Sequence, residues 1–284
     1  MDGILIINKP LGMSSHHCVS RVRKALNTKK VGHSGTLDVE ASGVLVLGIN
    51  KGTKLLNYLN QDDKRYRFTL AIGKTTDTLD HTGVFMTEKP IESVPNIDEI
   101  LSNFIGPYTQ IPPAYSAVKV EGKKLYEYAR NNETIPKIAA RTLTIHTLKR
   151  VSELTTINSE HFVDCEVHAS KGIYVRVLAN DIAKKCHSVG YTQAIHRLQA
   201  GTFTIEEAVT LDDDLASAII PMNEALRDMP SMIVSIPEIQ KIKNGQPLVL
   251  NHHAEILKCI DENGQLLAIY ERNDTYYKAK NVFI

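Results

Sequence analysis

The residues best placed for chemistry lie in the glycine-rich run VGHSGTLDVEASGVLVLG, which begins at Val31. Gly32, Gly35 and Gly43 bracket a histidine, a serine, a threonine and Asp38. Glycine lets a backbone approach a ligand closely, and such a loop can hold a short polar side chain in a fixed direction. The run therefore predicts a site at which Asp38 acts as a single carboxylate.

Asp38 also has a plainer interpretation, as the side chain of an Asx-turn or a helix cap. Its surroundings favour chemistry, because residues 9–54 contain eight basic side chains and, besides Asp38, one acidic side chain, Glu40. The glycine spacing matches neither the phosphate loop that ends in GK[ST] nor the dinucleotide fingerprint G-x-G-x-x-G. The run alone leaves open whether Asp38 is catalytic or structural.

Charge is distributed unevenly along the 284 residues, although the net charge is only +1. Besides the basic flank of Asp38, a second basic stretch spans residues 119–150, and acidic residues gather between 206 and 228. Such a chain can present a basic face to phosphate groups while it remains near neutral overall. The alternative is that these charges belong to solvated helix faces.

Local patterns predict the elements that hold the glycine-rich run in place. Residues 3–9, GILIINK, read as a short strand, and a turn at 10–12 leads to a helix that Ser14 or Ser15 can cap. After the run, RYRFTLAIG alternates between polar and apolar residues, which places Tyr66 on the apolar face of a half-buried strand.

The remaining patterns give a coarse order of elements. A helix is expected at 93–106, closed by Gly106, and a surface excursion at about 110–146 mixes prolines, tyrosines and basic residues around a short helix. A strand at 161–170, a helix at 174–186 and a third helix at 192–198 follow.

From about residue 229 the pattern changes to short strands, with a hairpin signal at Asn263-Gly264. We therefore expect a larger α/β domain at 1–228 and a small β-rich unit at 229–284. The chain is long enough for such a division, on the usual size of about 100 to 200 residues per domain.

Composition argues against a membrane or secreted protein and against a fold held together by zinc or disulfides. No run of about 18 apolar residues is present, and the N-terminus lacks the order of a signal peptide, so a cytoplasmic protein without a membrane segment is expected. The four cysteines are scattered without a CxxC pair, so neither a zinc site nor a disulfide framework is expected.

Several blocks along nearly the whole chain occur in the order found in one family. They are GILIINKPLGMSS, GHSGTLD with ASGVLVLG, KRYRFTLAIGKTTDTLDHTG, IPPAYSAVKVEGKKLYEYAR, and SKGIYVRVLANDI followed by HRLQAGTF. On these blocks the chain resembles the TruB family of tRNA pseudouridine synthases. The resemblance implies the α/β (α+β) pseudouridine synthase fold, with a mixed, largely antiparallel central sheet and a small C-terminal RNA-binding module of the PUA type.

The resemblance also implies roles for individual residues. Asp38 becomes the catalytic aspartate, Tyr66 the tyrosine that stacks on the target uracil, and Arg176 the arginine that pairs with the aspartate. Arg176 falls in the first turn of its expected helix, where the helix dipole disfavours a cation by roughly 0.3 to 1 kcal/mol, so it needs an anionic partner. The plainer alternatives are a surface or phosphate-binding arginine and a tyrosine that only packs in the core.

A second group of residues is implied to bind the substrate. His33 would line the site of the flipped base, with a purely structural histidine as the alternative. Lys9 and Pro10 would support the floor of the site, and Ile195 would fill an apolar wall. Tyr174 would contact the substrate, and the excursion would close over the RNA.

The implied activity is the isomerisation of uridine 55, in the T loop of tRNA, to pseudouridine. The reaction breaks the N-glycosidic bond and joins uracil C5 to C1′ of the same ribose, so it gains no atoms and requires no metal or other cofactor. One carboxylate suffices, because no water has to be activated as in ordinary glycosidases. The residues leave open an ionic or covalent ribose intermediate and a glycal.

The expected partner is the T-arm of tRNA, bound by a monomer. Two rival functions remain open. One is a catalytically silent protein that binds or folds tRNA, and the other is an N-glycosidase or base-exchange enzyme that uses Asp38.

The chain also departs from the usual pattern of the family. The departures are Asn8, Val39, Glu40, Ala169 and His196. Glu40 adds a negative charge near Asp38, so it bears on the rate and the pH profile more than on the identity of the enzyme. The polar segment 74–83 is expected to be a turn-rich loop in which Asp77 and Asp80 form Asx-turns rather than a cation site.

Overall fold

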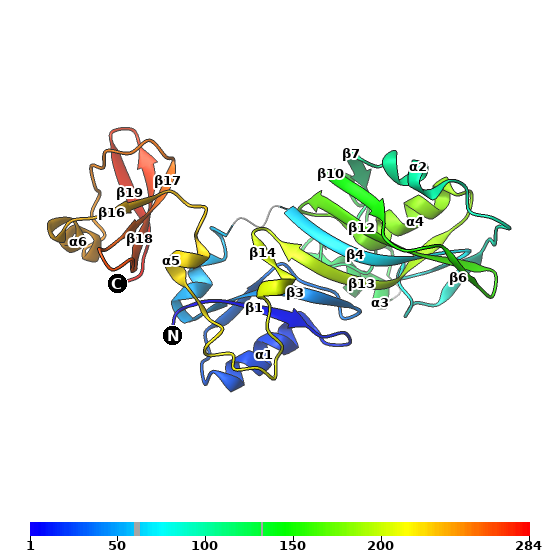
Figure 1. Ribbon diagram of the computed structural model, residues 1–284, viewed down its shortest axis with the longest axis horizontal. Helices are drawn as coiled ribbons and strands as arrows, with labels where there is room; N and C mark the ends of the chain where they lie inside the picture. The colour runs from blue at the N-terminus through cyan, green and yellow to red at the C-terminus, as the bar shows by residue number, and fades with distance from the viewer. Residues whose placement is uncertain (60–62, 132) are drawn as a thin grey trace.

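A large mixed sheet dominates the computed structural model, which describes residues 1–59, 63–131 and 133–284. Within these residues the sheet has 11 strands, and it runs through most of the elongated molecule in Figure 1. Across the sheet the main order is β15 (Ile220–Pro221), β1 (Gly3–Lys9), β3 (Ala41–Ile49), β13 (Gly190–Ala200), β4 (Asp63–Ile72), β12 (Glu160–Ser170), β10 (Arg141–Arg150) and β7 (Gly106–Gln110). Three short strands pair at its margins, namely β2 (Val31–Ser34) with β3, β11 (Thr155–Ile157) with β12, and β14 (Phe203–Thr204) with β13.

The strand β13 lies between two strands that follow each other in the sequence. It pairs parallel with β3 and antiparallel with β4, and the other pairings along the main order are antiparallel. Gly43 permits the close approach of β3, because a Cβ at this position would lie 2.2 Å from the carbonyl oxygen of Arg197. The predicted fold class, a mixed and largely antiparallel sheet with helices, is confirmed.

The helix α1 (Ser15–Ala25) packs on one face of β1 and β3. Its N-cap is Ser14, whose hydroxyl oxygen accepts a hydrogen bond from the backbone N–H of His17 at 3.1 Å, as the predicted cap requires. The buried side chains of Cys18, Val19 and Val22 join the apolar cluster formed by the facing strand residues.

The helix α4 (Val175–Lys185) packs on β4 and β13. Leu178 and Ile182 are fully buried in the cluster that also holds Tyr66, Phe68 and Leu70 of β4. The predicted alternation in β4 is confirmed, because these three side chains face the helix while the polar side chains between them face away. The two long helices thus fix the β1–β3 part and the β4–β13 part of the sheet.

The helix predicted at 192–198 is wrong, since these residues belong to β13. Two irregularities in the pairing of β13 with β4, between Thr192 and Ala194 and between Arg197 and Gln199, interrupt the alternation of inward and outward side chains. A β-bulge places two residues of one strand opposite one residue of its partner, so the period of two is lost there.

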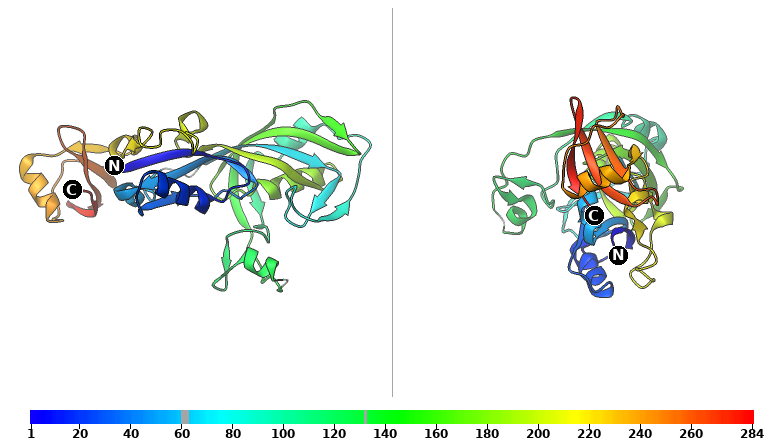
Figure 2. Two further views of the ribbon diagram at one scale, coloured as in Figure 1. Left: turned by 90° about the horizontal axis from the view of Figure 1, so that it is seen from below. Right: turned by 90° about the vertical axis from the view of Figure 1, so that its left-hand side faces the viewer.

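The excursion lies between the end of β7 and the start of β10. It carries β8 (Lys119–Val120), β9 (Lys123–Lys124) and α3 (Leu125–Arg130), and both views in Figure 2 show it, in green, projecting away from the sheet. The prediction extended it to residue 146, but residues 141–146 already belong to β10 of the main sheet. Residue 132, in the predicted short helix, lies outside the described residues.

The remaining elements of the first part of the chain are short. They are β5 (Lys74–Thr76), β6 (Phe85–Glu88), α2 (Ile97–Ser102), α5 (Met222–Ala225) and the 3₁₀ helices η1 (Asn50–Leu55) and η2 (Ile205–Glu207). The helix α2 is shorter than predicted, because Gly106 is not its cap but the first residue of β7.

A separate four-stranded sheet follows near the C-terminus, at one end of the molecule in Figure 1. It consists of β16 (Ser231–Ile233), β17 (Ile256–Ile260), β18 (Leu266–Asn273) and β19 (Tyr276–Val282), with the helix α6 (Ile236–Lys243) beside it. The predicted Asn263-Gly264 turn connects β17 to β18. The domain boundary at 228 and 229 and the PUA type of this unit stay predictions.

A buried lysine joins the small sheet to the larger part of the chain. The ammonium of Lys258, in β17, donates hydrogen bonds to the carbonyls of Asn223 and Leu226, both at 2.9 Å. Lys51 also donates to the carbonyl of Phe283. The two parts are therefore held together by polar contacts as well as by a shared apolar cluster.

The four cysteines are buried and free. Among the helices that the structure describes, none has both the length and the apolarity that a membrane crossing requires.

Candidate active site

Asp38 and Arg176 form an ion pair at the centre of the candidate site. Asp38 lies in the loop between β2 and β3, and Arg176 is the second residue of α4. One guanidinium nitrogen, Nη2, lies 2.9 Å from Oδ2 of Asp38. The arginine side chain is only 5% exposed whereas that of the aspartate is 49% exposed, so the cation is fixed inside the protein while the carboxylate is accessible to a ligand.

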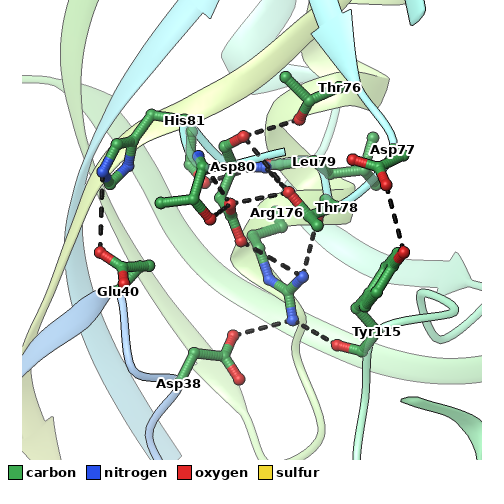
Figure 3. A network of polar contacts seen from close by, with 12 residues as sticks. Asp38, Glu40, Thr76, Asp77, Thr78, Leu79, Asp80, His81, Tyr115 and Arg176 are labelled. Atoms are coloured by element: carbon green, nitrogen blue, oxygen red, sulfur yellow. Dashed lines mark hydrogen bonds and ion pairs between the residues drawn. The ribbon is translucent and has the colours of Figure 1, made fainter. Parts of the chain in front are cut away.

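Two further segments hold the guanidinium of Arg176, as Figure 3 shows. Its Nη1 donates to the carbonyl of Thr78 at 2.7 Å and lies 3.6 Å from Oδ2 of Asp80. Its Nη2 also donates to the carbonyl of Tyr115 at 2.8 Å. The planar group is therefore oriented by the loop between β5 and β6, by the excursion and by Asp38 together.

Asp80 combines the predicted turn with a contact that was not predicted. Its Oδ1 accepts hydrogen bonds from the hydroxyls of Thr78 and Thr82, both at 2.7 Å, and from the N–H of Thr82 at 3.1 Å. Its other oxygen faces Arg176. The Asx-turn prediction is confirmed for Asp80, whose buried carboxylate also serves as a second anion for the arginine. Asp77 makes a different contact, because its Oδ1 accepts from the N–H of Val84, seven residues further along the chain.

Two adjoining cavities open beside Asp38. A small one of about 100 Å³ and a larger one of about 460 Å³ share Thr36, Asp38, Tyr66, Ile173 and Tyr174 among their lining residues. Ile195 and Arg176 line the small cavity. The structure thus brings five of the eight predicted site residues, Asp38, Tyr66, Arg176, Tyr174 and Ile195, around one space.

Tyr174 stands between the two cavities at the start of α4. It is the N-cap residue, and its backbone N–H donates to the side-chain oxygen of Gln110 at 2.9 Å. Burial raises the pKa of the Tyr174 phenol, so its hydroxyl keeps its proton at neutral pH.

Lys9 supports the loop that carries Asp38. Its fully buried ammonium donates to the carbonyls of Met13 at 2.6 Å, Pro10 at 3.0 Å and Val39 at 3.4 Å, and burial lowers its pKa. Neither Lys9 nor Pro10 is among the described residues that line the two cavities, and both line a separate cavity of about 700 Å³. Lys9 therefore holds the backbone next to Asp38.

His33 lies apart from the cavities beside Asp38. It is part of β2, paired with Leu47 of β3, and is not among the described residues that line either cavity. Burial, and after it the nearby charge of Arg197, lower the pKa of its imidazole. A neutral, structural histidine is the role that this position supports, and the base-site role stays a prediction.

Arg197 is a residue of the site that the sequence reasoning missed. Its side chain is fully buried, with Nε donating to the carbonyl of Val44 at 2.7 Å and Nη2 to that of Gly35 at 3.1 Å. It also lines the larger cavity, together with Lys64 and Lys171. In the sequence, only its position next to His196 pointed to Arg197 as a site residue. Because the pairing of β13 is irregular between Arg197 and Gln199, the sequence pattern did not indicate that the side chain points inward.

Glu40, a departure from the family pattern, has a partner in the structure. Its Oε2 lies 3.7 Å from Nε2 of His81, so the pair connects the Asp38 loop to the loop that carries Asp80 (Figure 3). Another departure, His196, is paired through Nδ1 with the hydroxyl of Ser42 at 2.8 Å. Neither contact involves one of the three residues predicted to be catalytic.

Within the described residues, no group of three or more histidine, cysteine, aspartate or glutamate side chains is arranged to hold a metal ion. The polar groups that meet at the cavities are a carboxylate, guanidinium groups, lysine side chains, phenols and the hydroxyls of serine and threonine.

Comparison with solved structures supports the fold. A chain in the crystal structure of a Cbf5-Nop10-Gar1 complex aligns with a TM-score of 0.72 and 21% sequence identity, covering 99% of this chain and 85% of that chain. A chain in the structure of an H/ACA RNP bound to a substrate RNA containing 2′-deoxyuridine aligns with a TM-score of 0.70 and 19% identity, with the same coverage. At these identities the likeness shows the fold alone.

Sequence comparison identifies closer relatives. The chain is 37% identical to tRNA pseudouridine synthase B of Staphylococcus aureus (strain JH9) over 303 residues, which cover 99% of both chains. It is also 37% identical to the protein of that name from Caldanaerobacter subterraneus subsp. tengcongensis, over 100% of this chain and 99% of that one. The model described as TruB family pseudouridylate synthase (N terminal domain) matches residues 23–175, more than half of the chain. With the site described above, these matches show that the chain belongs to the TruB family of pseudouridylate synthases.

Proposed function

We propose that this chain converts the T-loop uridine of tRNA, uridine 55, to pseudouridine; its bacterial relatives carry the name tRNA pseudouridine synthase B. The observation that carries the proposal is the half-exposed Asp38 carboxylate, paired with buried Arg176 beside a small cavity lined by Tyr66. This arrangement suits a reaction at a sugar carbon next to a planar base.

The chemistry requires a carboxylate more than it requires an acid and base pair. The bond between uracil N1 and ribose C1′ breaks, the base turns, a bond from C5 to C1′ forms, C5 loses its proton and N1 gains one. Asp38 assists the departure of uracil, and the guanidinium of Arg176, whose Nη2 lies 2.9 Å from Oδ2 of Asp38, aims the carboxylate. Both an ionic or covalent ribose intermediate and a glycal are consistent with this role.

The second carboxylate near the reaction is already engaged. Asp80 is 8% exposed, accepts three hydrogen bonds from two threonines and faces Arg176. Both of its oxygens therefore have partners, and neither is placed to activate water. Hydrolysis of a glycosidic bond normally needs a second carboxyl group for that purpose, so the site favours isomerisation over an N-glycosidase.

The small cavity provides the space for the base. Tyr66 lies on the apolar face of β4, and Ile195 lines the same cavity, so a ring between them would be held by stacking and apolar contact. A uridine in a folded T loop has to leave its stack to reach Asp38, at an unstacking cost of a few kcal/mol. The larger cavity, lined by Lys64, Lys171 and Arg197, gives the adjoining nucleotides a basic surface.

The proposal includes the T-arm of tRNA as the partner, bound by a monomer in the cytoplasm. Because cations line the larger cavity, tRNA binding should weaken as the salt concentration rises. The excursion, which projects beside the site, is proposed to contact the RNA.

The test is to incubate the protein with an unmodified tRNA transcript and map pseudouridine by mass spectrometry. The wild type should form one pseudouridine in the T loop, whereas Asp38→Asn should form none and still bind tRNA. A matched control is Asp212→Asn, because that carboxylate is 85% exposed and paired with Arg21 away from the two cavities. Full activity of Asp38→Asn would contradict the role of Asp38.

The same reaction separates the rival functions. A silent tRNA-binding or tRNA-folding protein would bind the transcript and leave every uridine unchanged. An N-glycosidase would release free uracil, which chromatography detects. The pairing of half-exposed Asp38 with buried Arg176 supports an enzyme, because a protein that only binds RNA has no need of an aimed carboxylate.

A further inference from the structure

The first residues of the excursion contact the start of α4, the helix that carries Arg176. We call residues 110–117 the excursion root. Gln110, at its start, accepts a hydrogen bond from the backbone N–H of Tyr174 through its side-chain oxygen at 2.9 Å. Tyr115 accepts one from Nη2 of Arg176 through its carbonyl at 2.8 Å. That nitrogen also faces Asp38, so the root shares a donor group with the catalytic carboxylate.

Tyr115 is itself held in place through its side chain. Its hydroxyl donates to Oδ2 of Asp77 at 3.2 Å, and Oδ1 of Asp77 accepts from the N–H of Val84 at 2.8 Å (Figure 3). Burial, and after it the charge of Asp77, raise the pKa of the Tyr115 phenol, so the hydroxyl stays a donor. The phenol thus ties the root to the loop that also provides Thr78 and its carbonyl for Arg176.

The residues that follow Tyr115 face the space in which RNA would lie. Ser116 and Ala117 line the larger cavity, as do Asp38 and Tyr66. A nucleotide in that cavity would therefore touch the residue next to the carbonyl that holds Arg176. The residue that would contact RNA, Ser116, therefore directly follows the residue whose carbonyl orients the guanidinium, Tyr115.

We propose that Tyr115 is a positioning residue for Arg176, and that occupation of the larger cavity by RNA is transmitted through the excursion root to the guanidinium beside Asp38. This inference rests on the proposed function, because it assumes that the cavity receives RNA. It assigns the excursion a second task in addition to contact with the substrate. The carbonyl of Tyr115 orients the cation, and the Tyr115 hydroxyl fixes that carbonyl.

The decisive variant is Tyr115→Phe, which keeps the ring and the carbonyl but removes the hydrogen bond to Asp77. We expect the single-turnover rate at saturating protein to fall about threefold to tenfold, the range for one hydrogen bond. The Kd for tRNA should stay within about twofold of the wild type.

Asp77→Asn tests the other end of the same contact. The amide still accepts from the N–H of Val84 but replaces the charged acceptor of the Tyr115 hydroxyl. It should slow the reaction in the same direction, and the double variant should be no slower than the slower single variant, since both remove one interaction. Effects that simply multiply would overturn a shared path through this hydrogen bond.

Tyr128→Phe is the matched control. Its hydroxyl donates to the carbonyl of Val120 at 3.3 Å, within the excursion itself. The same atom is deleted from the same segment, but without a contact to the loop that holds Arg176. The rate should stay at its wild-type value.

A second measurement is independent of turnover. The Nε–H resonance of Arg176 in the free protein, assigned with Arg176→Lys, should move in Tyr115→Phe and stay unchanged in Tyr128→Phe. If the wild type forms no pseudouridine, the proposed function fails while this resonance still decides the positioning role. A Tyr115→Phe variant with an altered Kd but an unchanged rate and an unchanged Arg176 resonance would overturn the inference.

Discussion

Arg176→Lys is the substitution that most directly tests the geometry of the site. The guanidinium uses two nitrogens in two directions, Nη1 toward Thr78 and Asp80 and Nη2 toward Tyr115 and Asp38. A lysine keeps the charge but has one nitrogen, so it can satisfy only one of the two directions. The variant separates the need for a cation from the need for an oriented fork.

The structure allows the cost to be estimated. If the ammonium takes the place of Nη2, the carbonyl of Thr78 loses its donor in an environment where the arginine side chain is 5% exposed. An unsatisfied buried acceptor costs about 1–3 kcal/mol, and Asp80 loses its cation as well. We expect the free energy of unfolding to fall by about 2–4 kcal/mol. A misplaced group at a reacting centre can lower the rate by about 100-fold.

Two assays measure these effects. Urea denaturation gives the change in the free energy of unfolding. Release of tritium from C5 of uridine in a labelled transcript, at saturating protein, gives the single-turnover rate. Arg227→Lys is the control, because this arginine also contacts a carboxylate, Glu207, and a carbonyl but is 43% exposed. It should change the free energy of unfolding by less than about 1 kcal/mol.

A single-turnover rate of Arg176→Lys within about twofold of the wild type would refute the reasoning, because a point charge would then serve as well as the fork. A large loss of stability with an unchanged rate would show that Arg176 is structural only.

Other perturbations have separate expected outcomes. Asp38→Asn should abolish pseudouridine formation but lower the free energy of unfolding by less than about 1 kcal/mol in urea, because its carboxylate is half exposed. Lys258→Met should lower the free energy of unfolding by about 2–4 kcal/mol, since two buried carbonyls lose their donor, while the rate at saturating tRNA is retained. Burial lowers the pKa of His33, His168 and His196 below the ordinary 6.5, so the unfolded chain binds more protons between the two values. The urea concentration at the midpoint of unfolding should therefore fall as the pH drops through 6.5, and it should no longer depend on these groups once the pH is below their pKa values in the folded protein. His168→Asn should reduce this pH dependence.

The first part of the fold could be predicted because it depends on local patterns. A strand, a turn and a helix capped by Ser14 follow one another within 25 residues, and each has its own signal. The alternation around Tyr66 survives because β4 is flanked by partners on both sides, one of its faces is apolar and the other is polar.

The wrongly predicted helix at 192–198 has a physical cause. In β13 the register shifts twice against β4, and in β10 it shifts between Ile145 and Thr147. The two shifts in β13 break the period of two, so this strand looked like a helix. Residues 141–145 keep the alternation and pair regularly with β7, so the shift in β10 does not explain the misplaced end of the excursion. Pairing with strands that are distant in the sequence determines the secondary structure of these residues, and a local pattern does not reveal that pairing.

The candidate site was predictable only in part for a similar reason. Asp38, Tyr66 and Arg176 followed from residue types and from the resemblance to the family. The contact of Arg176 with Asp80 joins residues far apart in the sequence, and the one with Tyr115 involves a backbone carbonyl, which any residue type would supply. Such a partner leaves no trace in the residue types of a single sequence.

The place of β13 between β3 and β4 has a consequence for synthesis on the ribosome. At roughly 5–20 residues per second, β13 emerges on the order of ten seconds after β3. Until then, the facing edges of β3 and β4 lack their partner and are open to wrong pairing with other chains. The sheet that brings Asp38 and Tyr66 together is completed only when the last third of the chain arrives, so a nascent chain shorter than about 200 residues should be both inactive and prone to aggregate.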